Sequence, residues 1–175
     1  MSNISIQSLA ADELDAHADW LADIMALTVE DGAAIGFMQP FSTADGLTFF
    51  TEQVFPEVRA GRRRLLVASL DGRTVGSVQL IITLPPNQPH RCEVAKMMVS
   101  PLARRKGVGR ALMQALDAEA RAAGKTLVTL DTKTGDKAEP LYRAAGFKTA
   151  GVIPGFALDP DGKARHATTY MYKDL

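Results

Sequence analysis

A short stretch in the second half of the chain combines residue types that bind anions. Three consecutive basic residues, Arg104 to Lys106, stand directly before Gly107 and Gly109 of a Gly-x-Gly, and an apolar-periodic segment follows. Glycines at a helix start let backbone N–H groups approach a ligand, and the helix dipole makes a phosphate the favoured one. Basic side chains at a helix N-terminus oppose the dipole, so a bound anion explains their placement better than a solvated helix start does.

Two common phosphate loops fit these residues poorly. The Walker A pattern requires Gly-Lys followed by Ser or Thr, and this stretch contains none. The dinucleotide fingerprint Gly-x-Gly-x-x-Gly would need a glycine where Leu112 stands. A nucleotide-hydrolysing loop and a dinucleotide site are therefore both disfavoured.

A third pattern, Arg-x-x-Gly-x-Gly, is met by Arg104, Gly107 and Gly109. It resembles the pyrophosphate loop of the GCN5-related N-acetyltransferase (GNAT) superfamily. Two further segments resemble that family in the same order: EVAKMMV (93–99) looks like its fourth strand, and LYRAAGF (141–147) looks like its last helix. A narrower resemblance is to the tabtoxin-resistance branch, whose members acetylate a small amino-bearing β-lactam toxin. It is carried by DGAAIGFM (31–38), EVAKMMV, LDTKTGD (130–136) and the tail from Ile153 to Lys173.

The resemblance implies direct transfer of acetyl from acetyl-CoA (coenzyme A) to an amine, without a covalent enzyme intermediate. The backbone of 105–110 would hold the pyrophosphate. The edge of 97–99 would pair with the pantetheine arm, because strands four and five of the family separate at a bulge. The cofactor-binding residues implied in this way are Met97, Met98, Val99, Arg104, Arg105, Lys106, Gly107, Val108, Gly109, Arg110 and Tyr142.

Three residues are candidates for proton transfer. Tyr142 matches the family's usual general acid, since a phenol stays protonated at neutral pH and can donate to a thiolate; packing on a short apolar helix is the alternative. Glu93 lies where many members carry a carboxylate and is a candidate base, directly or through a water. Asp131, on the neighbouring strand, is a second candidate. Either carboxylate could instead bind the substrate ammonium or close a strand end.

Other reactive side chains carry less of the expected chemistry. Many family members have an asparagine seven residues before the tyrosine, whereas this chain has Gly135, so Thr134, Asp136 or Lys137 must replace that contact or it is missing. Cys92 should face away from the site if Glu93 faces it, because neighbouring strand residues point to opposite sides. The three histidines lack ligand spacing, so we expect no metal site.

The acceptor pocket is expected from two loops. Gly36, Phe37 and Met38 lie between the first two predicted helices, where the family builds this pocket, and Phe156 and His166 lie in the branch-like tail. We therefore predict an N-acetyltransferase that acts on a primary amine of a small molecule, such as an amino-acid-like toxin or antibiotic. A protein or peptide N-acetyltransferase and a non-catalytic acyl-CoA sensor are the alternatives.

The elements that must position these residues follow from periodicity and turn signals. The order β-α-α-β-β-β-α-β-α-β-β predicts an α/β (α+β) fold, with one mixed, mostly antiparallel sheet and about four helices. The expected strands are 4–9, 64–70, 74–84, 91–100, 126–132 and two within 148–175; the expected helices are 11–32, 42–61 (bent near Pro56), 108–124 and 136–147, the last capped by Asp136 and Glu139. In the first helix, Leu14, Leu21, Ile24 and Leu27 share the apolar spacing.

The composition excludes several classes of protein. Lys plus Arg equals Asp plus Glu, at 20 each in 175 residues, so the basic surplus of a nucleic-acid binder is missing. The single cysteine, the lack of a secretion signal and the lack of an apolar run near ~18 residues lead us to expect a cytoplasmic protein without a membrane partner. We expect one domain over 1–175. Homodimers are common among the relatives, which leaves a homodimer open.

Overall fold

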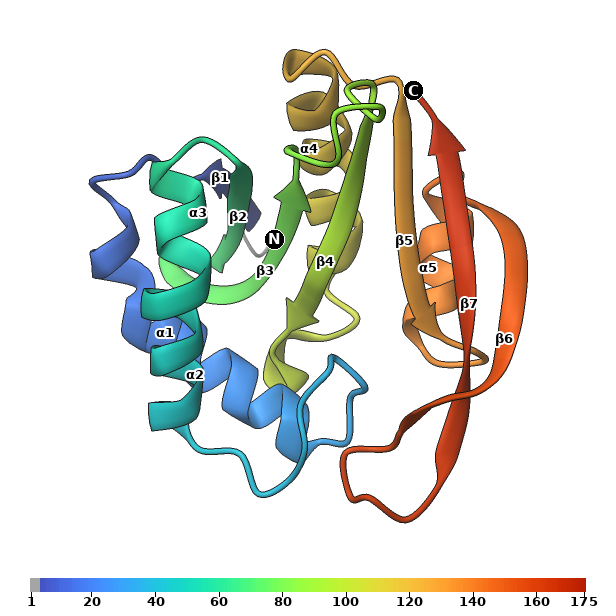
Figure 1. Cartoon of the computed structure of the whole chain (residues 1–175). Helices are drawn as coiled ribbons and strands as arrows, with labels where there is room; N and C mark the ends of the chain where they lie inside the picture. Colours follow the sequence, from blue (N-terminus) through green and yellow to red (C-terminus); the bar gives the residue numbers. More distant parts are fainter. Residues whose placement is uncertain (1–3) are drawn as a thin grey trace.

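Seven strands form one sheet in the order β1-β2-β3-β4-β5-β7-β6 in the computed structural model, which describes residues 4–175 (Figure 1). β4 and β5 are parallel, and the other neighbouring pairs are antiparallel. The strands are β1 (Ile4–Ser8), β2 (Arg63–Leu70), β3 (Arg73–Ile81), β4 (Arg91–Val99), β5 (Leu127–Lys133), β6 (Lys148–Leu158) and β7 (Arg165–Asp174). The predicted element order and the mixed, mostly antiparallel sheet are confirmed.

Helices cover both faces of this sheet. On one face lie α1 (Leu14–Glu30), α2 (Thr43–Phe49) and α3 (Phe55–Arg59), which share a core with Leu65, Val67 and Met98. On the other lie α4 (Val108–Ala122) and α5 (Ala138–Ala144), whose core includes Leu66, Val78 and Val94. A 3-10 turn, Pro101–Ala103, links β4 to the start of α4. Residues of β2 alternate between the two cores, with Leu65 and Val67 on one face and Leu66 and Ala68 on the other, so this strand has two buried faces.

The second predicted helix changes its hydrogen-bond pattern before its proline. A π-helical segment, Phe50–Val54, joins α2 to α3, and Pro56 lies in the first turn of α3. Proline has no N–H to give to the preceding turn, and the wider π turn accommodates this loss. Ser42 and Asp45 form a capping box at the start of α2.

Two expectations about the helices are wrong. Leu27 is 48% exposed, because at 100° per residue it lies about 140° round α1 from Leu14. The cap of α5 by Asp136 does not form. Lys137 is the N-cap residue, and the Glu139 carboxylate instead accepts the Gly135 N–H at 2.8 Å. Asp136 is thereby left to face the space between β4 and β5.

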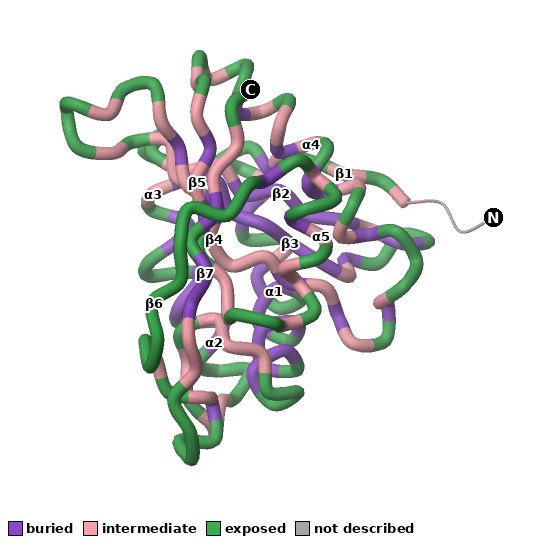
Figure 2. The backbone as a smooth tube through the Cα atoms, turned by 90° about the vertical axis from the view of Figure 1, so that its right-hand side faces the viewer, coloured by how far each residue is buried: buried purple, intermediate pink, exposed green. Residues whose placement is uncertain are grey.

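Two hairpins are present in the sheet. Asp71 and Gly72 join β2 to β3 with positive φ values of 50° and 82°, which are typical of an Asp-Gly turn. β6 and β7 form the second hairpin, and β6 is exposed along nearly its whole length as the edge strand (Figure 2). Within residues 4–175, no helix is long and apolar enough to cross a bilayer.

Candidate active site

β4 and β5 pair over three residues and then separate. Arg91 to Glu93 pair with Leu127 to Thr129, and beyond this point the two ribbons diverge (Figure 1). A bulge on β4 lies at the same level, because Ala95 pairs with Gln79 whereas Met98 pairs with Ser77. Lys96, in the bulge, has a φ of 50°. The separation that the family resemblance implies is therefore present, and it leaves the β5-facing edge of 97–99 without a strand partner among the described residues.

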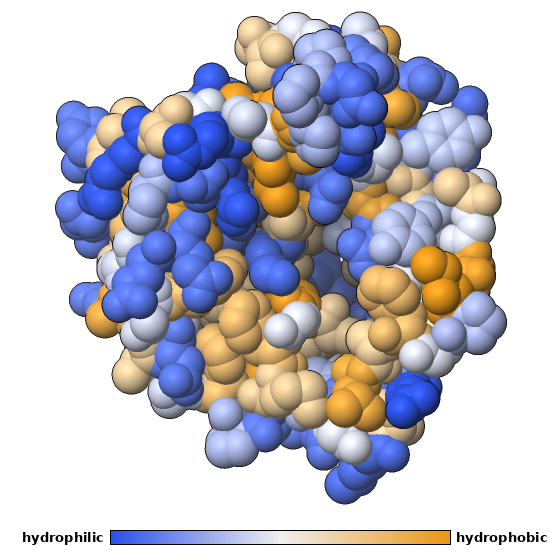
Figure 3. All heavy atoms as spheres, viewed as in Figure 1, coloured by the Kyte–Doolittle hydropathy of each residue, from blue (hydrophilic) through white to orange (hydrophobic). Residues whose placement is uncertain are grey.

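A cleft of about 1840 Å³ occupies the space where the strands separate. The space-filling view shows this face hollowed, with both apolar and polar side chains reaching the hollow (Figure 3). Nearly all of the predicted site residues line it, and Lys106 is the exception. The predicted residues in the lining are Gly36, Phe37, Met38, Glu93, Met97, Met98, Val99, Arg104, Arg105, Gly107, Val108, Gly109, Arg110, Asp131, Tyr142, Phe156 and His166.

The start of α4 presents free backbone N–H groups to the cleft. Gly107, the N-cap residue, has a φ of 86°, and the first intrahelical hydrogen bond runs from the Ala111 N–H to the Gly107 carbonyl at 3.0 Å. The N–H groups of 108–110 are therefore outside the helical hydrogen-bond pattern and fit an anion. Gly109 has a second reason to lack a side chain, since a Cβ there would lie 2.9 Å from Leu141 Cδ2 on α5.

The basic side chains of the loop differ in their ion pairing and exposure. The Arg104 guanidinium forms an ion pair with Asp31, in the loop that follows α1. Its charge is therefore partly neutralised before any ligand binds. Arg105 and Lys106 are exposed. The loop thus offers two exposed cations, one cation paired with Asp31, and the N–H groups of 108–110.

Tyr142 is both a core residue and a cleft residue. It is 6% exposed, its ring packs edge-on against Phe147 with centroids 6.1 Å apart, and it lines the cleft. Burial, followed by the negative charges of Asp131 and Asp136, raises the pKa of Tyr142 well above its usual range. The hydroxyl is therefore protonated at every physiological pH, as a general acid requires. Packing and proton donation are compatible roles for this side chain.

The two candidate bases reach the cleft from the neighbouring parallel strands β4 and β5. Glu93 pairs with Thr129 across the last paired position, and one of its oxygens lies 3.2 Å from Arg91 Nη1. Asp131 lies two residues beyond Thr129 and so points to the same face of the sheet. The Thr168 hydroxyl donates to Asp131 at 3.2 Å. Asp131 also influences the pKa of Tyr142, which places it in electrostatic range of the candidate acid.

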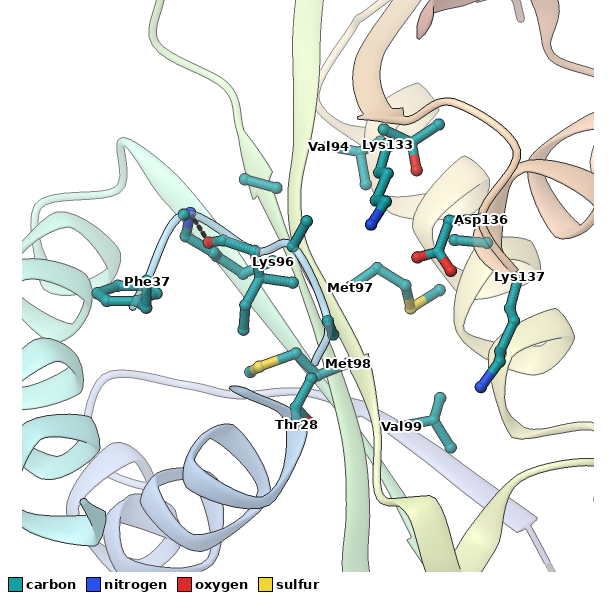
Figure 4. Close-up of a pocket in the computed structure, with 18 of the residues that line it drawn as sticks. Thr28, Phe37, Val94, Lys96, Met97, Met98, Val99, Lys133, Asp136 and Lys137 are labelled. Atoms are coloured by element: carbon teal, nitrogen blue, oxygen red, sulfur yellow. Dashed lines mark hydrogen bonds between the residues drawn. The ribbon is translucent and has the colours of Figure 1, made fainter. Parts of the chain in front are cut away.

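Lys96 is a cleft residue that the sequence analysis missed. Its ammonium donates to the Ile35 carbonyl at 2.7 Å and lies 5.3 Å from the centre of the Phe37 ring (Figure 4). Burial lowers the pKa of Lys96, and Asp131 partly opposes this. A lysine within the apolar strand EVAKMMV was the available signal. Arg63, the first residue of β2, also lines the cleft. The sequence analysis missed it because it belongs to no motif.

Charged side chains close in sequence to Gly135, where the family asparagine is absent, line the cleft. Asp136 and Lys137 line the cleft on the α5 side, and Lys133 reaches it from β5 (Figure 4). Lys133 is neutralised by Asp159, whose oxygen also lies 2.9 Å from His166 Nδ1. His166 is therefore held by Asp159 at the wall of the cleft.

The two predicted acceptor segments meet at one end of the cleft, but only the first is a loop at its predicted residues, because Phe156 lies on β6 and His166 on β7. The Gln39 N–H donates to the Pro160 carbonyl at 2.8 Å, which joins the loop after α1 to the loop between β6 and β7. Phe37 contacts the rings of Phe41 and Phe49 edge-on, at 5.0 and 5.1 Å. Phe156 lines the cleft but is 46% exposed.

Cys92 has the environment of a core residue. It is fully buried against α4, on the face opposite Glu93, and burial raises the pKa of its thiol to about 11. A thiol in this state is a poor nucleophile. Among the described residues, no cluster of three or more His, Cys, Asp or Glu is placed to hold a metal ion.

Comparisons with known proteins agree with this geometry. Residues 36–147 match the model of the acetyltransferase (GNAT) family. An IAA acetyltransferase from Azospirillum brasilense is 35% identical over 98 residues, which are 55% of this chain and 62% of that protein. The chain therefore matches less than two thirds of the length of that curated relative.

Solved structures share the fold over almost the whole chain. A ribosomal-protein-alanine N-acetyltransferase from Brucella melitensis has a TM-score of 0.79 and 23% identity, over 98% of this chain and 99% of that one. An acetyltransferase from Salmonella typhimurium, solved with its cofactor acetyl-CoA, has a TM-score of 0.79 and 21% identity, over 98% of this chain and 94% of that one.

Proposed function

Because the chain belongs to the acetyltransferase (GNAT) family, we propose that it transfers acetyl from acetyl-CoA directly to a primary amine of a small molecule. The observation that carries this proposal is the single cleft. It brings together a free helix N-terminus, an unpaired strand edge, two carboxylates and a protonated tyrosine.

The donor half of the cleft fits coenzyme A on two observations. The N–H groups of 108–110 can bind the pyrophosphate, and the β5-facing edge of 97–99 can pair with the amide-rich arm. Arg105 and Lys106 add charge attraction that salt screens. When bound, acetyl-CoA supplies the activated acetyl group.

The chain's own residues then handle two protons. An alkyl amine is mostly protonated in water, so Glu93 or Asp131 removes a proton before or during attack, directly or through a water. Tyr142 holds a proton at its hydroxyl and gives it to the departing sulfur. Both carboxylates face the cleft, and Tyr142 lies in electrostatic range of Asp131.

A small acceptor is favoured by the contact that closes one end of the cleft. The Gln39 to Pro160 hydrogen bond bridges the two acceptor loops, and the Phe37 ring cluster walls the space beneath them. We propose an amino-acid-like compound as the acceptor, with a tabtoxin-type β-lactam as one example. A peptide acceptor is the second candidate, because the name of the Brucella neighbour describes a protein substrate.

The test is a coupled assay of free thiol release. Purified protein, acetyl-CoA and a panel of amino acids, amines and short peptides should give turnover with at least one small amine. Turnover with peptides alone would replace the small-molecule acceptor by the peptide one. Tight binding of acetyl-CoA without turnover on any amine, unchanged in Tyr142→Phe, would identify an acyl-CoA sensor.

A further inference from the structure

We propose that Arg63, together with Gln79 and Lys96, forms a subsite that binds a carboxylate on the same small molecule that carries the reactive amine. This inference rests on the proposed function and names the chemical class of its acceptor. It concerns the part of the cleft under α1 to α3, away from the pyrophosphate loop.

Strand register places Arg63 in the same row as the candidate base. Arg63 on β2 pairs with Ile81 on β3, and Ile81 pairs with Glu93 on β4. All three line the cleft. Neighbouring strands lie about 4.8 Å apart, so the backbones of Arg63 and Glu93 are roughly 10 Å apart. One small molecule can therefore reach both side chains.

Hydrogen bonding leaves unused donors at this position. Arg63 Nη1 donates to Gln79 Oε1, whereas Arg63 Nε and Gln79 Nε2 are buried without a partner among the described residues. Gln79 is fully buried. Arg63 lines the cleft, so its guanidinium is part of the cleft wall. A planar guanidinium with free donors is suited to a carboxylate.

The charges around this position are also unbalanced. Within residues 4–175, Arg63 and Lys96 have no carboxylate oxygen within 4.0 Å. Glu57, the acidic residue that acts on Arg63, has both oxygens bound by Arg62 at 2.6 and 2.9 Å. Glu93 is held by Arg91.

The two cations are also close enough to repel each other. Burial lowers the pKa of Arg63 and of Lys96, and the charge of Arg63 lowers that of Lys96 further. Two neighbouring cations that are partly desolvated are costly unless an anion joins them. Two other carboxylates lie in the cleft. Asp131, on β5, attracts Lys96, and Glu52 is an exposed residue of the cleft wall. A substrate carboxylate between Arg63 and Lys96 would neutralise the pair.

The test compares matched acids and amides as acceptors. α-Amino acids, β-alanine and γ-aminobutyrate are each assayed beside the corresponding amide, with wild type and Arg63→Met. We expect wild type to prefer at least one acid by about tenfold or more in kcat/KM, as for a charged hydrogen bond. Arg63→Met should lose that preference while its rate with the amide stays within about threefold. The spacing of the preferred acid gives the distance between amine and carboxylate.

Arg64→Met is the matched control. Arg64 is the next residue of β2 and points to the opposite face, where it pairs with Glu119 at 3.7 Å. It should keep the acid preference. Arg63→Lys keeps the charge but not the planar guanidinium, so it should keep part of the preference for acids. It replaces Arg63→Met in the assay if Arg63→Met does not fold. Equal rates for acids and amides in wild type, or an unchanged preference in Arg63→Met, would overturn the subsite.

A binding readout separates this proposal from the proposed function. The N-acetylated forms of the same acids and amides are added to the protein, and the unfolding temperature is measured. We expect the N-acetyl acids to raise it in wild type and not in Arg63→Met. If this holds while no amine is acetylated, the proposed function fails and the subsite stands. If the N-acetyl acids and amides act alike on wild type, the subsite is wrong.

Discussion

The donor half and the acceptor half of the cleft are built in different ways. The donor half is formed by one continuous stretch, 97–110, and it offers backbone N–H groups and a strand edge. The acceptor half gathers side chains from β2 to β7 and from the loop after α1, among them Arg63, Lys96 and Asp131. Backbone recognition depends on conformation and tolerates side-chain changes, whereas the acceptor half depends on individual charged groups.

The largest effect should come from Tyr142, the proposed proton donor. Tyr142→Phe removes the hydroxyl and keeps the ring that packs against Phe147, so we expect kcat to fall about 100-fold or more, with the affinity for acetyl-CoA unchanged. Steady-state kinetics and calorimetry of acetyl-CoA binding measure the two quantities. Because burial raises the pKa of Tyr142, its ionisation should cause no loss of kcat between pH 8 and 10. A variant with full activity would remove Tyr142 from the chemistry.

The next effect should identify the base of the acceptor half. Glu93→Gln and Asp131→Asn each replace a carboxylate by an amide of similar shape. We expect the variant that lacks the base to have a kcat about 100-fold lower than wild type at pH 7. It should recover part of this loss at higher pH, where more amine is unprotonated. The other variant should mainly raise the KM of the amine. A pH profile of kcat for both variants checks this, and equal small losses would show that neither is the base.

The backbone of the donor half is tested by a change of one methyl group. A Cβ at Gly107 would make only an ordinary contact, 3.8 Å from Ile4 Cδ1, but the φ of 86° is strained for alanine. In Gly107→Ala, stability should therefore fall by about 1–2 kcal/mol, and acetyl-CoA should bind about tenfold more weakly. Gly124→Ala is the matched control at the other end of α4, with a φ of 70° and nothing within 4 Å. It should lose similar stability and keep its acetyl-CoA affinity. Equal losses of affinity in both variants would contradict a local role of the loop.

A smaller effect is expected from the exposed charges of the donor half. The double variant Arg105→Gln, Lys106→Gln removes two exposed cations and leaves the N–H groups in place. We expect the KM for acetyl-CoA to rise about threefold at low salt and to converge with wild type at high salt, because salt screens exposed charges. Titration of KM against sodium chloride measures this. A 100-fold rise would mean that side chains dominate the donor half after all.

Cys92 should have the smallest effect on activity. Cys92→Ala is expected to keep wild-type kcat at pH 8. The unfolded thiol loses its proton near pH 9, whereas the folded thiol keeps it to about pH 11, so wild-type stability falls across this range. The difference in free energy of unfolding between wild type and Cys92→Ala should therefore shrink from pH 8 to pH 11, as measured in urea. Loss of turnover in Cys92→Ala would instead support a covalent acyl-enzyme intermediate on Cys92.

Local patterns predicted the donor half better than the acceptor half. The strand, the glycine loop and the helix of 93–122 follow from periodicity and from glycine positions that lie close together in sequence. Errors arose where spacing alone was used. Leu27 was placed on the buried stripe of α1, and Asp136 was given a capping role that the Glu139 to Gly135 hydrogen bond replaces. The ion pair of Arg104 with Asp31 joins residues 73 positions apart, and no local pattern predicts it.

The sequence by itself determined the family resemblance through its motifs. It also determined the order of the elements and the glycine loop at the start of α4, because these depend on backbone conformations set by neighbouring residues. Only the tertiary structure decided which side chains share the cleft. Arg63, Gln79 and Lys96 lie on three strands, and they come together through sheet order, through register and through one bulge. A shift of register by one residue would turn each of these side chains to the opposite face, and no local pattern records that choice.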